Sequence, residues 1–431
     1  MNINKSRALI TVISLMACLA SYQLSALESQ GPRYSFNGFG TLGVVYSDED
    51  EADFVSSWFL QPNGAGHTSK WHAGIDTKLG GQLNARFNDR FSTVIQAVLE
   101  RQEDNAWTPS IEWANIQYHF SDTFSLRIGR TMLAPFMVSD TRLVGYANHW
   151  IRPPQELYQV IPLTNLDGLN VIYNRDFGSW RNTLQLTYGQ TDQDLVHKAE
   201  LQGREAIILS NSLEYGFATF HLGYLSAKIH LYSPASSALF SAYDDLGNTL
   251  AFIAGLEDAA VQASAINERY SLDDTAIEVF STGLRLEPGN WLFMAEWARN
   301  TEANILQKSE AWYASLGYRF NTVTPYLTLA EVNGDTSREP GVTTSGMPPS
   351  LATVSNTLNE TLNQVLSLGS PAQKSITVGI RWDFASNTAL KLQYQHIELD
   401  ENSSGRLVNT QPAFEPGNRA NTFSAVINFV F

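Results

Sequence analysis

Apolar and polar residues alternate along most of this chain with a period of two. In the segment 71–87, apolar Trp71, Ile75, Leu79 and Leu83 are interleaved with polar and charged side chains. Successive side chains of a β-strand point to opposite faces of the sheet, so this segment is predicted to be one long strand. The pattern recurs to give sixteen predicted strands, the others being 34–46, 91–99, 114–120, 124–128, 169–173, 184–188, 207–215, 220–224, 276–286, 291–299, 312–320, 324–333, 376–384, 390–394 and 423–431.

The two faces of these strands differ in chemistry. One face is apolar, while the other is dense in Lys, Arg, Asp, Gln and Asn. A sandwich in water would have to bury the apolar faces against each other, whereas a wall with lipid outside and water inside suits both faces. We therefore predict an all-β fold, a transmembrane antiparallel up-and-down β-barrel of about sixteen strands.

The links between the predicted strands alternate in length. Even strands are followed by short polar turns at 88–89, 121–122, 177–179, 216–218, 287–290, 321–323 and 385–387. Odd strands are followed mostly by long links, at 47–69, 132–165, 191–205, 231–275, 334–372 and 400–420, and by shorter ones at 102–110 and 301–308. Short turns at one rim and long loops at the other are typical of bacterial outer-membrane barrels. Aromatic residues gather near both rims, which predicts two interfacial girdles.

Composition and termini narrow the classes of function. The chain has 431 residues and a net charge of −15, which disfavours nucleic acid as a partner. Lys5 and Arg7, an apolar stretch over 8–20 and the pair Ser25-Ala26 have the order of a secretory signal peptide, so we expect a signal at 1–26 and a single barrel domain at 27–431. The only cysteine, Cys18, lies in that signal, so the exported chain is expected to form no disulfide.

Two segments within the long links have a different spacing. Apolar residues recur every three to four positions over 351–366, and the Ala-rich segment 249–266 is similar. This spacing predicts short amphipathic helices. Such helices could cap the pore mouth, pack on a neighbouring subunit or close their own loop, and the sequence leaves these alternatives open.

Three short features carry a resemblance to a known family. They are the opening strand at 36–43, the Ile128-Gly129-Arg130 step and the terminal Phe431. With them the chain resembles the Gram-negative outer-membrane porins over nearly all of its predicted mature length. The resemblance implies a homotrimer, a third long loop folded into the lumen, and a role for Phe431 as the signal read by the barrel-assembly machinery. The Pro-Glu-Phe-Gly-Gly motif of general diffusion porins is absent, and Met132-Leu133-Ala134-Pro135-Phe136 begins the third loop instead.

Candidate pore-lining residues follow from this loop and from strand parity. The loop 132–165 is expected to constrict the lumen unless it lies outside as a solvated loop, and Arg130 is included because it lies where the loop leaves the wall. The wall residues out of phase with the apolar face are net basic, which would favour anions, although internal pairs such as Arg381 with Asp383 would cancel that field. The candidates are Lys78, Arg86, Arg127, Arg130, Asp140, Arg142, Arg152, Glu156 and Arg381.

These observations predict a porin, a passive channel for small hydrophilic solutes in the outer membrane, in contact with its lipid. Whether it prefers anions, is specific for phosphate or small carboxylates, or is a plugged barrel acting as an adhesin or structural protein stays open. An outer-membrane hydrolase is the enzymatic alternative, but neither Gly-x-Ser-x-Gly nor His-Glu-x-x-His occurs. We therefore expect no enzymatic activity, no cofactor and no metal.

Overall fold

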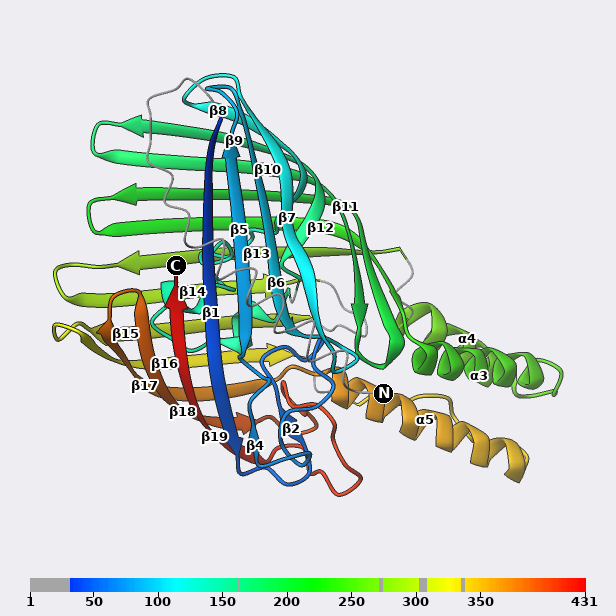
Figure 1. The fold of residues 1–431 in the computed structure, drawn as a ribbon. Helices are drawn as coiled ribbons and strands as arrows, with labels where there is room; N and C mark the ends of the chain where they lie inside the picture. The colour runs from blue at the N-terminus through cyan, green and yellow to red at the C-terminus, as the bar shows by residue number, and fades with distance from the viewer. Residues whose placement is uncertain (1–31, 162, 271–273, 302–307, 335–337) are drawn as a thin grey trace, which may run out of the picture.

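The chain forms a closed antiparallel barrel in a computed structural model that describes residues 32–161, 163–270, 274–301, 308–334 and 338–431 (Figure 1). The predicted signal at 1–26 lies outside the described residues. Each long strand pairs with its neighbours in sequence, and β1 (Arg33–Ser47) closes the barrel by pairing with β19 (Arg419–Val430) on one side and β5 (Lys78–Arg86) on the other. Sixteen long strands form the wall in the described part of the chain, as predicted.

The remaining strands of the wall follow in chain order. They are β6 (Phe91–Arg101), β7 (Trp107–His119), β8 (Phe124–Met132), β9 (Asn165–Phe177), β10 (Trp180–Leu195), β11 (Ala199–Tyr215), β12 (Ala218–Tyr232), β13 (Thr275–Leu286), β14 (Trp291–Asn300), β15 (Ser309–Tyr318), β16 (Val323–Gly334), β17 (Gln373–Ala385) and β18 (Thr388–Leu399). Short strands β2 (Asp53–Phe54) and β3 (Ala65–Gly66) pair with each other in the first long loop, and β4 (Trp71–His72) pairs with β1.

The short turns use residues that tolerate a left-handed backbone. Positive φ angles occur in five of these turns, at Gly178, Gly216, Gly289, Asn321 and Asn387. Glycine and asparagine adopt this conformation with the least steric cost, which allows two strands to reverse within a few residues. These turns lie at one rim of the barrel, and the long loops lie at the other (Figure 1).

Strand alternation separates the outer and inner faces as predicted. On β17 the apolar side chains Ile376, Val378 and Ile380 point outward, while Ser375 and Thr377, which alternate with them, are buried inside. Aromatic rings form two belts. Phe91, Tyr118, Phe120 and Phe124 contact one another in succession near the short turns, and Tyr46, Trp71, Tyr394 and Phe423 do so near the long loops.

Two predicted elements at the long-loop rim are corrected by the structure. The strand predicted over 71–87 is broken, because residues 73–77 bulge out of the ladder between β4 and β5. The long loop predicted over 191–205 is instead an extension of β10 and β11, joined by the 3-10 turn η2 (Val196–Lys198). The first error arises because residues 73–77 keep the alternating composition while they leave the ladder, and the second because the polar hairpin lacks alternation although its strands are paired.

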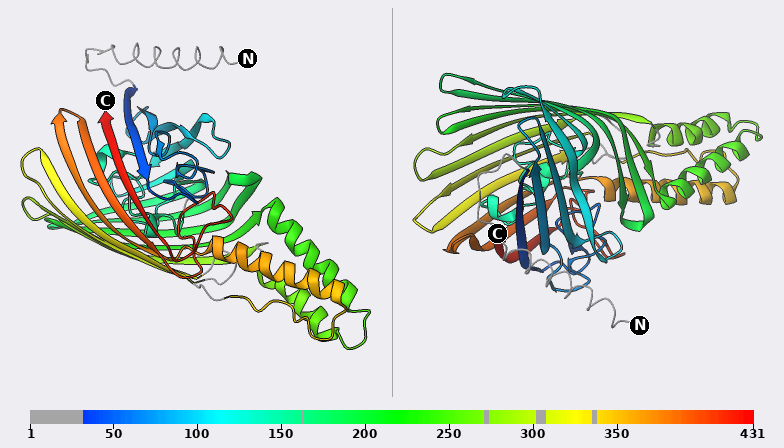
Figure 2. Two further views of the ribbon diagram at one scale, coloured as in Figure 1. Left: turned by 90° about the horizontal axis from the view of Figure 1, so that it is seen from below. Right: turned by 45° about the horizontal axis from the view of Figure 1, so that its top comes forward.

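Three helices project together from the long-loop rim (Figure 2). The helix predicted over 351–366 is confirmed as α5 (Pro349–Gly369), whereas the segment 249–266 spans the end of α3 (Pro234–Leu250) and most of α4 (Glu257–Tyr270), with a turn between them. The three helices share an apolar core that includes Tyr243, Ala263 and Leu362. The helices of two different loops therefore pack on one another, and whether they also contact a neighbouring subunit stays a prediction.

Candidate functional site in the barrel lumen

The third long loop, residues 133–164, lies inside the barrel, where it appears in teal (Figure 2). It contains the 3-10 turn η1 (Gly145–Ala147) and the helical turn α2 (Gln155–Tyr158). Its Trp150 donates the indole N–H to Thr328 Oγ1 at 2.9 Å on β16, and Ile151 N donates to Gln393 Oε1 at 3.3 Å on β18. Loop atoms therefore reach the inward face of the wall far from the strands that the loop connects.

Two cations of the wall hold the loop by its backbone. Lys391 is fully buried, and its ammonium donates to the carbonyl oxygens of Gly145, Asn148 and Trp150, each at 2.7 Å. Arg381 donates to the carbonyl oxygens of residues 146 and 148 at 2.7 and 2.9 Å, while Asp383 accepts from the same guanidinium at 2.8 Å. The predicted pore-lining residue Arg381 thus forms the internal pair considered from the sequence and also anchors the loop.

Apolar packing fixes the loop against one side of the lumen. Phe136, Trp150 and Leu157 belong to a buried cluster with Met294 and Tyr313, which point inward from β14 and β15. Each fully buried side chain of this size contributes about 1.5–3 kcal/mol. The expectation of a polar inner face all around the barrel is therefore wrong for β11 to β16, whose apolar inward residues are covered by the loop instead of water.

The first long loop, which includes β2 and β3, also enters the mouth of the barrel. Trp58 and Phe59 pack on the same cluster. The guanidinium of Arg406, from the loop between β18 and β19, lies 5.3 Å from the Trp58 ring centroid. The sequence analysis treated this loop only as a long link at the rim. The run Trp58-Phe59-Leu60 was the available signal, because three consecutive large apolar residues are unfavourable in a solvated loop.

A cavity of about 100 Å³ remains between the third loop, the first loop and strands β5 and β6. Two ion pairs line it. Lys78 Nζ lies 3.3 Å from Glu100 Oε2, and Arg152 of the third loop donates its Nε hydrogen to Asp76 Oδ1 at 2.9 Å and bonds Asp76 Oδ2 as well. These pairs neutralise four of the charged groups at the constriction. We call this cavity and its lining the eyelet.

Two eyelet cations, Arg101 and Arg142, lack such compensation, and Arg142 is the one on the third loop. It is half-buried, and its Nη1 donates to the carbonyl oxygen of Leu163 at 3.2 Å. In the described part of the chain, no carboxylate forms an ion pair with it at 4.0 Å or less. A guanidinium bonded only to neutral carbonyls leaves a net positive field in the cavity beside it.

The other candidates lie in three different places. Arg127 points inward and donates to Gln117 Oε1 at 3.1 Å, and Arg86 lies by the short turns, 3.3 Å from Asp89. The prediction that Arg130 lines the pore is wrong. Arg130 lies on the outer face, where it forms a bidentate ion pair with Asp167 at 2.8 and 2.7 Å. Its position two residues after Ile128, which is exposed on that face, gives it the outward parity.

Two acidic loop residues and the C-terminus complete the predicted set. Asp140 is exposed, whereas Glu156 is fully buried and accepts from Gln373 Nε2 at 2.8 Å. Phe431 exchanges backbone hydrogen bonds with Gly38 at 2.8 and 2.9 Å. The last residue is therefore joined to the first strand at the short-turn rim.

The described residues contain no helix that is both long and apolar enough to cross a membrane, and no cluster of three or more His, Cys, Asp or Glu side chains placed to hold a metal ion.

Several solved structures share this architecture. The chain aligns with OmpF of Salmonella typhi, solved with daunomycin, at a TM-score of 0.55 and 11% identity, covering 94% of this chain and 99% of that one. The outer-membrane channel DcaP of Acinetobacter baumannii aligns at a TM-score of 0.52 and 14% identity, covering 95% of this chain and 100% of DcaP. An anion-selective porin of Comamonas acidovorans aligns at a TM-score of 0.52 and 10% identity, covering 93% of this chain and 100% of that porin. No family model and no curated protein sequence matches. The chain therefore has the porin fold.

Proposed function

We propose that this protein is an outer-membrane channel that passes small hydrophilic solutes through the eyelet and favours small anions, such as carboxylates or phosphate. The porin fold supports a channel. The anion preference rests on one observation, the uncompensated guanidinium of Arg142 beside the two neutralised pairs of the eyelet. We also propose a homotrimer in contact with outer-membrane lipid, with Phe431 as its assembly signal and with no enzymatic activity.

The narrowness of the eyelet makes a single charge effective. A unit charge about 7 Å from a permeating ion in a water-like dielectric contributes about 0.6 kcal/mol, which enriches the counter-ion about threefold. Arg142 lines this small cavity between the first and third loops, so a solute that passes through the eyelet passes beside its guanidinium. In a wide pore the same charge would be screened over about 8 Å at physiological ionic strength.

The test is the reversal potential of the reconstituted protein in a planar bilayer under a salt gradient. We expect the wild-type channel to prefer chloride over potassium, Arg142→Gln to lower that preference about threefold, and Arg142→Glu to reverse it. Arg86→Gln is the matched control, because Arg86 is paired and lies at the short-turn rim. An unchanged reversal potential in Arg142→Glu would refute the anion proposal.

The same recording separates the channel from the plugged barrel. A correctly folded protein, recognised by its heat-dependent shift on a gel, should insert with steady conductance, and steps in groups of three would support the trimer. Absence of conductance from that folded material would favour an adhesive or structural role instead. Added phosphate or small dicarboxylates should reduce the conductance if either solute binds in the eyelet.

A further inference from the structure

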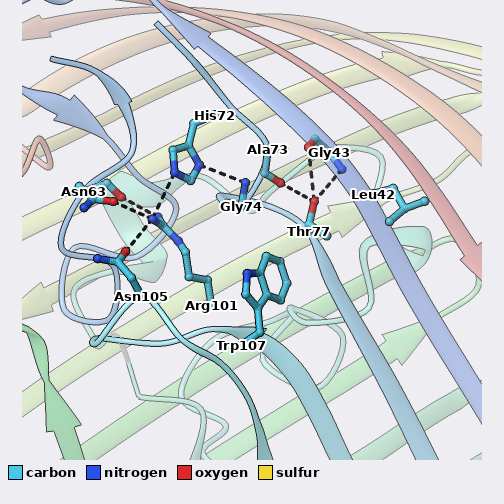
Figure 3. A pocket seen from close by; sticks show the side chains of 10 residues that line it. All are labelled: Leu42, Gly43, Asn63, His72, Ala73, Gly74, Thr77, Arg101, Asn105 and Trp107. Atoms are coloured by element: carbon cyan, nitrogen blue, oxygen red, sulfur yellow. Dashed lines mark hydrogen bonds between the residues drawn. The ribbon is translucent and has the colours of Figure 1, made fainter. Parts of the chain in front are cut away.

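A second cavity, of about 760 Å³, opens on the outer side of the barrel at the long-loop rim (Figure 3). It is separate in position from the eyelet, although Arg101 borders both. Its polar lining comes from the first loop, β4, the end of β6 and the turn before β7, and its apolar lining comes from β1 and β7. The main lining side chains are Leu42, Asn63, His72, Arg101, Asn105 and Trp107.

The cavity exists because the wall is incomplete at the bulge. His72 pairs with Val45 and Lys78 with Thr41, so residues 73–77 lie opposite only residues 42–44 of β1. The Thr77 hydroxyl replaces the missing ladder: Gly43 N donates to Thr77 Oγ1 at 3.0 Å, and that hydroxyl lies 2.6 Å from the Ala73 carbonyl oxygen. The backbone is thereby satisfied while a gap is left beside it.

Arg101 enters this gap with neutral partners only. The residue is 5% exposed, and its guanidinium donates to Asn63 Oδ1 at 2.8 Å, Asn63 O at 2.6 Å and Asn105 Oδ1 at 3.1 Å. Its Nε hydrogen has no acceptor. The carboxylate whose field reaches it, Asp53, instead accepts hydrogen bonds from Thr68 and Asn409. A nearly buried cation without an ion-pair partner is costly, and an anion in the cavity would lower that cost.

His72 adds a second donor at the same place. Its Nδ1 accepts the Gly74 N–H at 3.0 Å, so the neutral ring must carry its hydrogen on Nε2. That atom lies 3.3 Å from Arg101 Nη1, which is also a donor. Both Nη1 hydrogens already go to Asn63 and Asn105, so the His72 Nε2 hydrogen and the Arg101 Nε hydrogen are the donors left for an oxygen of an anionic group in the cavity.

The opposite side of the cavity is apolar and faces outward. Leu42 is 58% exposed and pairs across the ladder with the outward residue Ile427, and Trp107 is 44% exposed beside it. We propose that this outer cavity binds the anionic headgroup of an amphiphile, a phosphate or carboxylate on a hydrocarbon chain, with the headgroup at Arg101 and His72 and the chain along Leu42 and Trp107. The site would serve surface lipid or an amphiphilic ligand and not the permeating solute.

Calorimetric titration of the purified protein in dodecyl maltoside micelles with dodecyl phosphate tests the site. We expect saturable binding of one ligand per chain and at least a tenfold weaker Kd in Arg101→Gln. Arg130→Gln is the matched control, because Arg130 lies on the outer face but is fully paired with Asp167, and its Kd should stay within twofold of wild type. Inorganic phosphate, which has the headgroup without the chain, should not compete at equal concentration.

Each alternative outcome overturns the proposal in a distinct way. Wild-type protein without saturable binding would mean that the cavity is closed or covered by a neighbouring subunit. An equal loss of affinity in Arg101→Gln and Arg130→Gln would mean a general charge effect at the micelle surface. Competition by inorganic phosphate would mean a simple anion site. If Arg101→Gln does not fold, Trp107→Ser removes the chain contact at an exposed position and should weaken dodecyl phosphate binding by the same measure.

Discussion

The buried ammonium of Lys391 should determine whether the third loop stays seated in the lumen. Its three hydrogen bonds are each 2.7 Å long and go to carbonyl oxygens of one short stretch of the loop. A hydrogen bond to a charged group contributes about 1.5–3 kcal/mol, and each orphaned buried carbonyl costs about 1–3 kcal/mol. Because the ammonium must also be desolvated, we expect Lys391→Met to cost about 3–5 kcal/mol in loop anchoring, less than the simple sum.

Single-channel recording measures this loss directly. Lys391→Met should raise the open conductance and add rapid fluctuations, because the loop would leave its seat for part of the time. Lys374→Met is the matched control, since Lys374 lies on the neighbouring strand but points outward to Glu398 at 3.2 Å. A Lys391→Met channel with wild-type conductance, noise and heat stability would refute the anchoring argument, because a loop held by apolar packing alone needs no ammonium.

Two further predictions test the packing of the lumen and of the projecting helices. Trp150→Ala should destabilise the seated loop by about 3–5 kcal/mol and lower the temperature at which the folded band shifts on a gel, with Trp150→Phe intermediate because it keeps most of the packing but loses the bond to Thr328. In the helices, burial and the hydrogen bond to Glu339 raise the pKa of Tyr270 to about 12 from its ordinary value of 10. The three helices should therefore keep the stability that neutral Tyr270 contributes below pH 10 and lose it as the pH rises to about 12. The difference in tyrosinate absorbance between the wild type and Tyr270→Phe measures that titration.

The barrel could be predicted from the sequence because the alternation within each strand identifies its apolar and its polar face. Alternation depends on neighbouring residues only, so Ile376, Val378 and Ile380 identify an outward face without knowledge of the partner strand. The same rule fails at a bulge. Residues 73–77 keep the alternating composition while leaving the ladder, and Arg130 was assigned to the lumen by its nearness to the loop when parity with Ile128 placed it outside.

The site was less predictable because contacts between loop and wall join residues far apart in sequence. Parity with the outward residue Leu392 places Lys391 on the inner face, but only the position of the third loop shows that its ammonium is fully buried. The ion pair between Arg152 and Asp76 likewise depends on how the third loop crosses the barrel. Arg381 and Asp383, two positions apart on one strand, form a pair that spacing alone suggests.

The loops also change how charge acts in this barrel. A sixteen-stranded wall alone would leave a wide wet lumen, in which scattered charges are screened and selectivity is shared among many residues. Here apolar side chains of the third loop cover the inward face of β11 to β16, and the first loop fills the mouth. The route that we propose for solutes is the eyelet, where Lys78 and Arg152 are already matched by carboxylates. On that proposal selectivity depends on very few groups, because Arg101 and Arg142 are the cations in the described lining of the eyelet that have no ion-pair partner.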